Sequence, residues 1–164
     1  LFIIIIGNAL AASSKYEAVT GFDLNRYLGR WYEIARLPFK YQDGLVNVTA
    51  TYSLRDDGKV KVVNEGYKGT KEGNRSIAVG KAKFASSPDK GHLRVSFFWI
   101  FYADYTIIAL DPDYQWAMVG SSNKYLWILA REPRLDKGIL DSLISRAYEM
   151  GFDTDRLIFT HQEW

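Results

Sequence analysis

The feature that most constrains the fold of this chain is a succession of short β-rich runs between residues 31 and 131, each ended by turn-forming residues. Asp57-Gly58 and Gly73-Asn74 are two of these turns, and such pairs supply the positive φ that tight hairpins need. Eight strands at this spacing predict an antiparallel up-and-down barrel or a β-sandwich. The predicted strands are 31–37, 46–54, 59–67, 75–84, 92–99, 104–110, 115–121 and 125–131.

Alternation of apolar and polar residues indicates which face of each strand lies inside. Val60 and Val62 alternate with Lys59 and Lys61, so the valines are predicted to face the interior and the lysines the solvent. The run 104–110 is apolar on both faces, and alternation therefore assigns no inward set to it.

Several of the predicted inward positions hold very small residues, namely Ala50, Ala78, Gly80 and Ala82. An eight-stranded barrel is just wide enough to be packed with side chains or to hold one small ligand. Small residues on one wall favour a hollow barrel. The alternative is that large residues on the opposite wall fill the space.

Beyond the strands the apolar period changes from two residues to that of a helix. From Leu140 apolar residues recur at i, i+3, i+4 and i+7, which predicts a helix over 136–150 packed by its apolar stripe on the barrel wall. Asp136 is a suitable N-cap and Gly151 a suitable stop. Residues 157–159 are predicted to form a short final strand.

Composition narrows the classes of protein that this chain can belong to. Its 164 residues suit one domain with one sizeable core. A net charge of +2 without a basic stripe argues against nucleic acid as a partner. The absence of cysteine removes disulfides, thiolate metal sites and thiol catalysis.

No catalytic or cofactor-binding motif is evident in the sequence. It has no Gly-x-Ser-x-Gly, no phosphate-binding loop and no dinucleotide fingerprint, so we expect no cofactor. His92 and His161 are both expected at the surface, and their spacing suggests no metal site. Glu33 is the one carboxylate predicted to point into the barrel, either as a buried acid or, more simply, in an ion pair with a nearby Arg or Lys.

The first residues have the pattern of a secretory leader. An apolar run over 1–6 is followed by Ala9-Leu10-Ala11, as where an apolar signal-peptide region meets its cleavage site. We therefore interpret 1–12 as the remnant of a signal peptide; a short buried strand or an ordinary tail is the alternative. Leu10-Ala11-Ala12 commonly precedes a lipidated cysteine, but residue 13 is serine, which predicts an exported protein without that anchor unless Ser13 replaces a cysteine.

Three ordered motifs resemble the signatures of the lipocalin family. Residues 29–36 (GRWYEIAR) resemble the first, 110–114 (LDPDY) the second and 127–131 (WILAR) the third. Residues 49–58 (TATYSLRDDG) are similar to the bacterial outer-membrane lipocalins and to their plant and apolipoprotein D relatives. The resemblance spans nearly the whole chain and implies a lipocalin domain over 22–160 with an eight-stranded antiparallel barrel and an outer C-terminal helix.

The resemblance implies that the signature residues are structural. Trp31 and Arg131 would meet at the closed end of the barrel, where a guanidinium stacked on an indole contributes roughly 0.5–2 kcal/mol. Gly29 belongs to the first signature, and Asp113 and Tyr114 would close a tight turn on the same floor. These residues would identify the fold without touching a ligand.

By the same resemblance the ligand enters at the other end of the barrel. Residues 38–45 would form a lid. The apolar run 98–102 shows no alternation, which favours a rim facing lipid or a second subunit; a place in the core is the alternative. A fatty acid or lysophospholipid is the implied ligand, with Lys40 and Arg36 near its headgroup. The predicted lining of the cavity is Ala35, Ala50, Tyr52, Val62, Ala78, Gly80, Ala82, Val95, Phe97, Met118, Tyr125 and Trp127.

The sequence thus predicts a lipid-binding or transport protein of the cell envelope, periplasmic or associated with the outer membrane. Two other functions are compatible with the same scaffold. An enzyme of the isomerase or de-epoxidase type would need Glu33 or an interior tyrosine as its acid or base. An interaction protein would have a filled barrel and would form a homodimer through residues 98–102.

Overall fold

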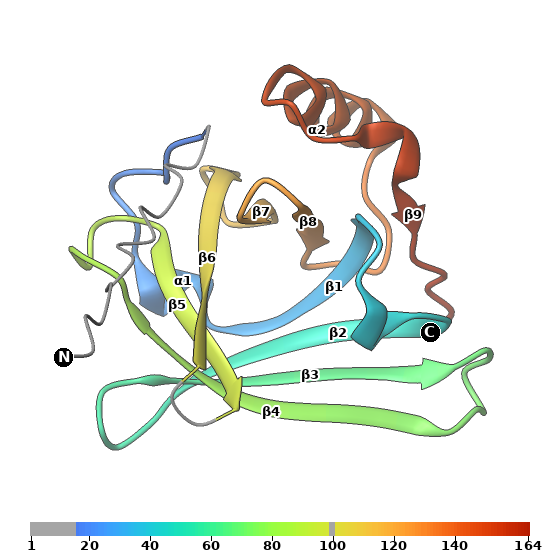
Figure 1. The fold of residues 1–164 in the computed structure, drawn as a ribbon, viewed down its shortest axis with the longest axis horizontal. Coiled ribbons are helices and arrows are strands. Elements are labelled where there is room, and N and C mark those ends of the chain that lie inside the picture. Colours follow the sequence, from blue (N-terminus) through green and yellow to red (C-terminus); the bar gives the residue numbers. More distant parts are fainter. Residues whose placement is uncertain (1–15, 99–100) are drawn as a thin grey trace, which may run out of the picture.

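The computed structural model describes residues 16–98 and 101–164, in which nine strands form one antiparallel sheet. The elements are α1 (Leu24–Tyr27), β1 (Gly29–Arg36), the 3-10 turn η1 (Lys40–Gln42), β2 (Leu45–Leu54), β3 (Val60–Lys68), β4 (Arg75–Phe84), β5 (His92–Phe98), β6 (Phe101–Leu110), β7 (Trp116–Ser121), β8 (Tyr125–Ala130), α2 (Lys137–Glu149), the 3-10 turn η2 (Thr154–Arg156) and β9 (Ile158–Phe159). The strands are ordered β2-β3-β4-β5-β6-β7-β8-β1-β9, and β1 also pairs with β2. This second pairing closes β1–β8 into a barrel, with α2 outside it (Figure 1).

The predicted barrel and its outer helix are confirmed, and the ends of the elements differ by a few residues. β6 begins at Phe101 rather than at residue 104, and α2 spans Lys137–Glu149 with Asp136 as its N-cap. The interpreted signal-peptide remnant 1–12, Ser13 and the residues 99–100 of the predicted rim lie outside the described residues.

One end of the barrel is closed by the segment that precedes β1 (Figure 1, left). Phe22 and Tyr27 from this segment pack with Trp31 and with Tyr114 of the β6–β7 turn in a buried cluster. The cluster continues along the inner faces of the strands through Val60, Val62, Ala82, Leu93, Ile107, Ala117, Val119 and Leu129. This half of the interior is therefore filled by the protein's own side chains.

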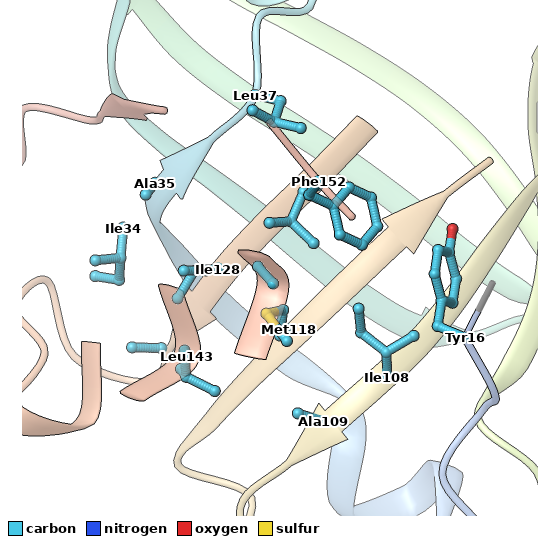
Figure 2. Packing of buried hydrophobic residues seen from close by; sticks show 13 residues of the cluster. Tyr16, Ile34, Ala35, Leu37, Ile108, Ala109, Met118, Ile128, Leu143 and Phe152 are labelled. Carbon is cyan, nitrogen blue, oxygen red and sulfur yellow. The ribbon is translucent and has the colours of Figure 1, made fainter. Parts of the chain in front are cut away.

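α2 packs against the outside of the barrel wall and forms a second buried cluster (Figure 2). Leu143 and Ala147 of the helix are buried against Ile128 of β8 and Met118 of β7. Tyr16 joins this cluster by stacking on Phe152, with ring centroids 5.3 Å apart. No helix within the described ranges is long and apolar enough to cross a membrane.

The N-cap of α2 provides a test of how firmly this helix is held. The Asp136 carboxylate accepts a hydrogen bond from the backbone N–H of Ile139 at 3.0 Å. We expect Asp136→Ala to lower the free energy of unfolding by about 1 kcal/mol, measured by urea denaturation. Asp141→Ala is the matched control, because Asp141 only pairs with the exposed Lys137 on the same helix and should leave stability nearly unchanged. Equal losses in the two variants would contradict a capping role.

The segment that follows β9 completes the barrel wall. The β1–β2 ladder runs only from the Gly29–Tyr52 pair to the Tyr32–Thr49 pair, and the two strands separate beyond it. There the Gln162 amide donates to the carbonyls of Glu33 at 2.8 Å and Val48 at 2.9 Å, and so bridges the two strands. Asn47, at a positive φ of 49°, binds the same segment through hydrogen bonds with His161 and Glu163.

Candidate functional site

A cavity of about 210 Å³ lies inside the barrel between the closed-end cluster and the segment that joins β1 to β2. Its walls are mostly apolar and aromatic, with a few polar groups. The lining residues are Glu33, Phe39, Gln42, Val48, Thr49, Ala50, Tyr52, Val62, Asn64, Val95, Phe97, Ala103, Asp104, Tyr105, Ser121, Tyr125, Trp127 and Leu129.

The structure brings together seven of the twelve residues predicted to line the cavity. These are Ala50, Tyr52, Val62, Val95, Phe97, Tyr125 and Trp127. The other five, which are Ala35, Ala78, Gly80, Ala82 and Met118, lie elsewhere, and each has a structural reason.

Ala35 faces α2 rather than the interior because β1 contains a bulge. Glu33 pairs with Leu129, but Ala35 pairs with Ile128, so one residue of β1 is unmatched between them. The bulge reverses the faces of the residues that follow it. Ala35 is consequently buried in the outer cluster, and the inward position passes to Arg36, the partner of Trp127.

Met118 also belongs to the outer cluster. It pairs with Ile128, and both side chains pack under α2 (Figure 2). Val119, the partner of Trp127, faces the interior instead. The prediction for Met118 was wrong because both faces of β7 are buried, and alternation cannot choose between two apolar faces.

The three small residues of β4 occupy three different environments. Ala82 is buried in the closed-end cluster, whereas Ala78 is exposed and lies beyond the described β4–β5 pairs, which begin at Lys81. Gly80 faces the interior but is covered by the ring of Phe97, whose nearest atom would lie 2.8 Å from a Cβ at this position. Gly80 therefore lets the large side chain of Phe97 approach the sheet rather than leave an open space.

The segment joining β1 and β2 covers the cavity as a lid. The Phe39 ring packs edge-to-face on Tyr125 and Trp127, with centroids 5.3 and 5.7 Å apart. The Gln42 side chain accepts a hydrogen bond from the Trp127 indole at 2.9 Å and donates one to Glu33 at 2.6 Å. The predicted lid residue Lys40 lies outside, with its ammonium 4.9 Å from the centre of the exposed Tyr41 ring.

Glu33 and Arg36 form a buried ion pair beneath the lid. Arg36 Nη1 donates to the Glu33 carboxylate at 3.0 Å, Arg36 Nη2 donates to the Gln42 carbonyl at 2.7 Å, and both side chains are almost fully buried. Thr160 donates to the same carboxylate. Burial raises the pKa of Glu33, while Arg36, Thr160 and Gln42 act in the opposite direction. Arg36 is therefore bound to the protein itself, and its predicted place near a ligand headgroup is wrong.

The signature residues lie at the closed end in one connected group. The Arg131 guanidinium stacks 3.9 Å from the centre of the Trp31 indole and donates to the carbonyls of Arg26, Arg30 and Tyr114. Gly29 has φ 97°, a conformation that favours glycine, and a Cβ there would lie 3.3 Å from Arg131 Nη1 and so crowd the stacked guanidinium.

The turn next to this group is closed mainly by Asp111. Its carboxylate accepts hydrogen bonds from the backbone N–H groups of Asp113 and Gln115, each at 3.1 Å. Tyr114 has a positive φ of 59°, and its hydroxyl accepts a hydrogen bond from Asp23 N–H at 2.9 Å. Asp113 contributes its backbone rather than its carboxylate.

The floor of the cavity carries three linked tyrosine hydroxyls. Tyr105 Oη lies 2.7 Å from Tyr27 Oη and 2.7 Å from Tyr52 Oη. Burial raises the pKa of Tyr52 to about 12 and the pKa values of Tyr27 and Tyr105 well above the ordinary value. All three hydroxyls therefore stay protonated and neutral at physiological pH.

The described residues contain no group of three or more His, Asp or Glu side chains placed to hold a metal ion. His92 approaches Asp104 at 3.3 Å in a partly exposed pair, and His161 lies beside Glu163 at 3.7 Å. Both histidines are at the surface, as the sequence predicts.

The sequence interpretation missed several lining residues, of which Phe39, Gln42 and Tyr105 matter most. Phe39 and Gln42 lie within the predicted lid, and an aromatic residue in that segment was an available signal. Tyr105 lies in the run that is apolar on both faces, so no periodic signal pointed to it. The wall formed by residues 160–163 shows no periodicity at all.

A barrel that is closed at one end by an arginine-stacked tryptophan and hollow below a lid has the architecture of the β-barrels that are wide enough to hold one small ligand. The model of the Lipocalin-like domain matches residues 22–162. The chain is 43% identical over 162 residues to outer membrane lipoprotein Blc of Vibrio cholerae, covering 98% of this chain and 94% of that protein. The chain belongs to the lipocalin family.

More distant relatives extend the same family. Temperature-induced lipocalin-1 of Arabidopsis thaliana is 35% identical over 163 residues, covering 93% of this chain and 86% of the relative. Among solved structures, insecticyanin of the tobacco hornworm Manduca sexta superposes with a TM-score of 0.72 at 20% identity, covering 90% of this chain and 85% of that one. At this identity the likeness to insecticyanin shows the fold alone.

Proposed function

We propose that this chain binds one single-chain lipid, a fatty acid or a lysophospholipid, in the barrel cavity and serves lipid traffic or membrane maintenance in the cell envelope. The observation that carries the proposal is the cavity itself, whose walls come from Val62, Val95, Phe97, Leu129 and the aromatic residues beneath the lid. Transfer of a chain from water into such a site gains about 0.8 kcal/mol per buried methylene group. The headgroup would lie at the lid, near Lys40 and the polar atoms of Gln42.

The polar groups of the cavity support binding rather than catalysis. The Glu33 carboxylate, one of the two candidates for the acid or base of an enzyme, already accepts hydrogen bonds from Arg36, Thr160 and Gln42. The tyrosine hydroxyls are bonded to one another and have raised pKa values, which makes them poor general bases. We therefore assign the cavity a carrier role.

The relatives support a location in the envelope. The Vibrio cholerae and Escherichia coli relatives are both named outer membrane lipoproteins. We propose that this protein is likewise exported and is periplasmic or associated with the outer membrane. Pairing of two copies through the rim around residues 98–102 remains a prediction from the sequence.

A substitution that fills the cavity tests the proposal. Ala50 lines the cavity on β2, so Ala50→Trp is expected to weaken binding of oleic acid and of lysophosphatidylethanolamine at least about tenfold by occupying their space. Isothermal titration calorimetry on delipidated protein gives the affinities. Ser53→Trp is the matched control, because Ser53 is exposed on the outer face of the same strand. Equal affinities of the two variants, or no binding of either lipid by the wild type, would contradict the proposal.

A further inference from the structure

The three tyrosine hydroxyls at the cavity floor leave one proton without an acceptor. Tyr27, Tyr105 and Tyr52 carry one hydroxyl proton each, and the two O···O contacts that join them use two of these protons. The third proton has no acceptor among the residues that the structure describes. Whichever way the chain of hydrogen bonds runs, one hydroxyl remains a free donor.

The free donor can be presented to the cavity. Tyr52 and Tyr105 both line the cavity, whereas Tyr27 lies behind them in the closed-end cluster. When Tyr27 donates to Tyr105, the free proton belongs to Tyr105 or to Tyr52. A buried hydroxyl without a partner costs about 1–3 kcal/mol, so an acceptor in the cavity would favour these two arrangements.

The electrostatic potential at the cavity floor also favours a ligand atom that carries a partial negative charge. Burial raises the pKa of both Tyr27 and Tyr52, and the positive charge of Arg131 on the far side of Trp31 partly opposes this effect in each case. The same positive potential would stabilise the partial negative charge of a ligand oxygen. The floor is thus a polar point at the end of a largely apolar cavity.

We propose that the ligand of this cavity carries a hydrogen-bond-accepting oxygen at its buried end, bound by the hydroxyl of Tyr105 or Tyr52. This inference rests on the proposed function and narrows its ligand class. The oxygen has two sources: a hydroxyl or carbonyl near the far end of an acyl chain, or the carboxyl group of a fatty acid that enters headgroup first.

The test compares plain and ω-hydroxy fatty acids on variants of the tyrosine group. Dodecanoic, tetradecanoic and hexadecanoic acids and their ω-hydroxy forms are titrated calorimetrically into each protein. The triple variant Tyr27→Phe/Tyr52→Phe/Tyr105→Phe removes the whole group and leaves no hydroxyl without its partner, which limits the loss of stability. The single variant Tyr27→Phe is the matched control, because Tyr52 and Tyr105 retain one hydrogen bond and one free proton.

In the wild type and in Tyr27→Phe, the ω-hydroxy acid of the best-fitting length is expected to bind at least as tightly as its parent acid. In the triple variant its affinity should fall about tenfold while the parent acid is unaffected, because a buried polar group is then left unpaired. An equal fall for both acids would also support an oxygen at the floor and would assign it to the carboxyl group.

The inference is overturned if neither acid loses affinity in the triple variant while both bind the wild type. If the triple variant does not fold, the test rests on the wild type alone. The inference is then overturned if the wild type binds every ω-hydroxy acid tenfold more weakly than the parent acid of the same length. Failure of all the parent acids to bind the wild type would instead remove the proposed function.

Discussion

Trp31→Ala is expected to lower the free energy of unfolding by about 3–5 kcal/mol, the range for removal of a large buried aromatic side chain. Trp31 is fully buried, and its indole lies between the Arg131 guanidinium at 3.9 Å and the Tyr27 ring at 4.8 Å. Its Nε1–H also donates to the Tyr27 carbonyl at 2.8 Å. The substitution therefore leaves a cavity, an unstacked cation and an unsatisfied carbonyl in the same place. Urea denaturation followed by far-UV circular dichroism measures the effect.

Trp164→Ala is the control for this experiment. Trp164 is 61% exposed and contacts the surface residues Tyr32 and Arg30. Its removal should cost far less stability than removal of Trp31, since little apolar area returns to water. Similar losses for both tryptophans would show that the closed end does not hold the barrel as the packing indicates.

Arg36→Met is expected to lower the free energy of unfolding at pH 7 by about 3–5 kcal/mol, because it leaves the Glu33 carboxylate buried without its cation. The pair is almost inaccessible to solvent, so water compensates poorly for the loss of the guanidinium. The loss should shrink as the pH falls toward 4.5, the ordinary pKa of this side chain. Without Arg36 the folded-state pKa of Glu33 rises further, so the folded protein binds a proton that the unfolded chain releases, and its stability falls as the pH rises through that window.

The double variant Glu33→Gln/Arg36→Met separates charge from packing. Once both charges are removed the stability at pH 7 should recover most of the way to that of the wild type, and it should no longer show the loss with rising pH that Glu33 causes in Arg36→Met. Arg55→Met, which breaks the exposed Arg55–Asp57 pair, should have little effect. A double variant as unstable as Arg36→Met would show that the side chain of Arg36, rather than its charge, supports the lid.

The parts of this fold that could be predicted from sequence are those set by local patterns. Alternation with turn residues gave the strands, and the change of period gave α2, because each depends on burial of one face of a regular element. The stacking of Arg131 on Trp31 followed from a family signature rather than from any pattern within the chain.

The cavity lining was harder to predict, because it depends on contacts between residues that are distant in the sequence. One bulge in β1 exchanged the roles of Ala35 and Arg36, and no residue in the sequence marks where it lies. Gly80 suggested an open space, whereas it accommodates the ring of Phe97 from the neighbouring strand. A small residue in a strand indicates that another group lies close to the backbone there. Only the packed structure shows whether that group is a ligand or another side chain.

The Gln162 amide bridges β1 and β2 where the two strands separate, and this bridge has a consequence for how the barrel closes. Among the described residues, the gap between these two strands near the lid is bridged by residues 160–163, which lie more than one hundred positions later in the chain. Most hairpins of the barrel join strands that are neighbours in the sequence, whereas this side of the wall closes only when residues 160–163 pack onto β1 and β2.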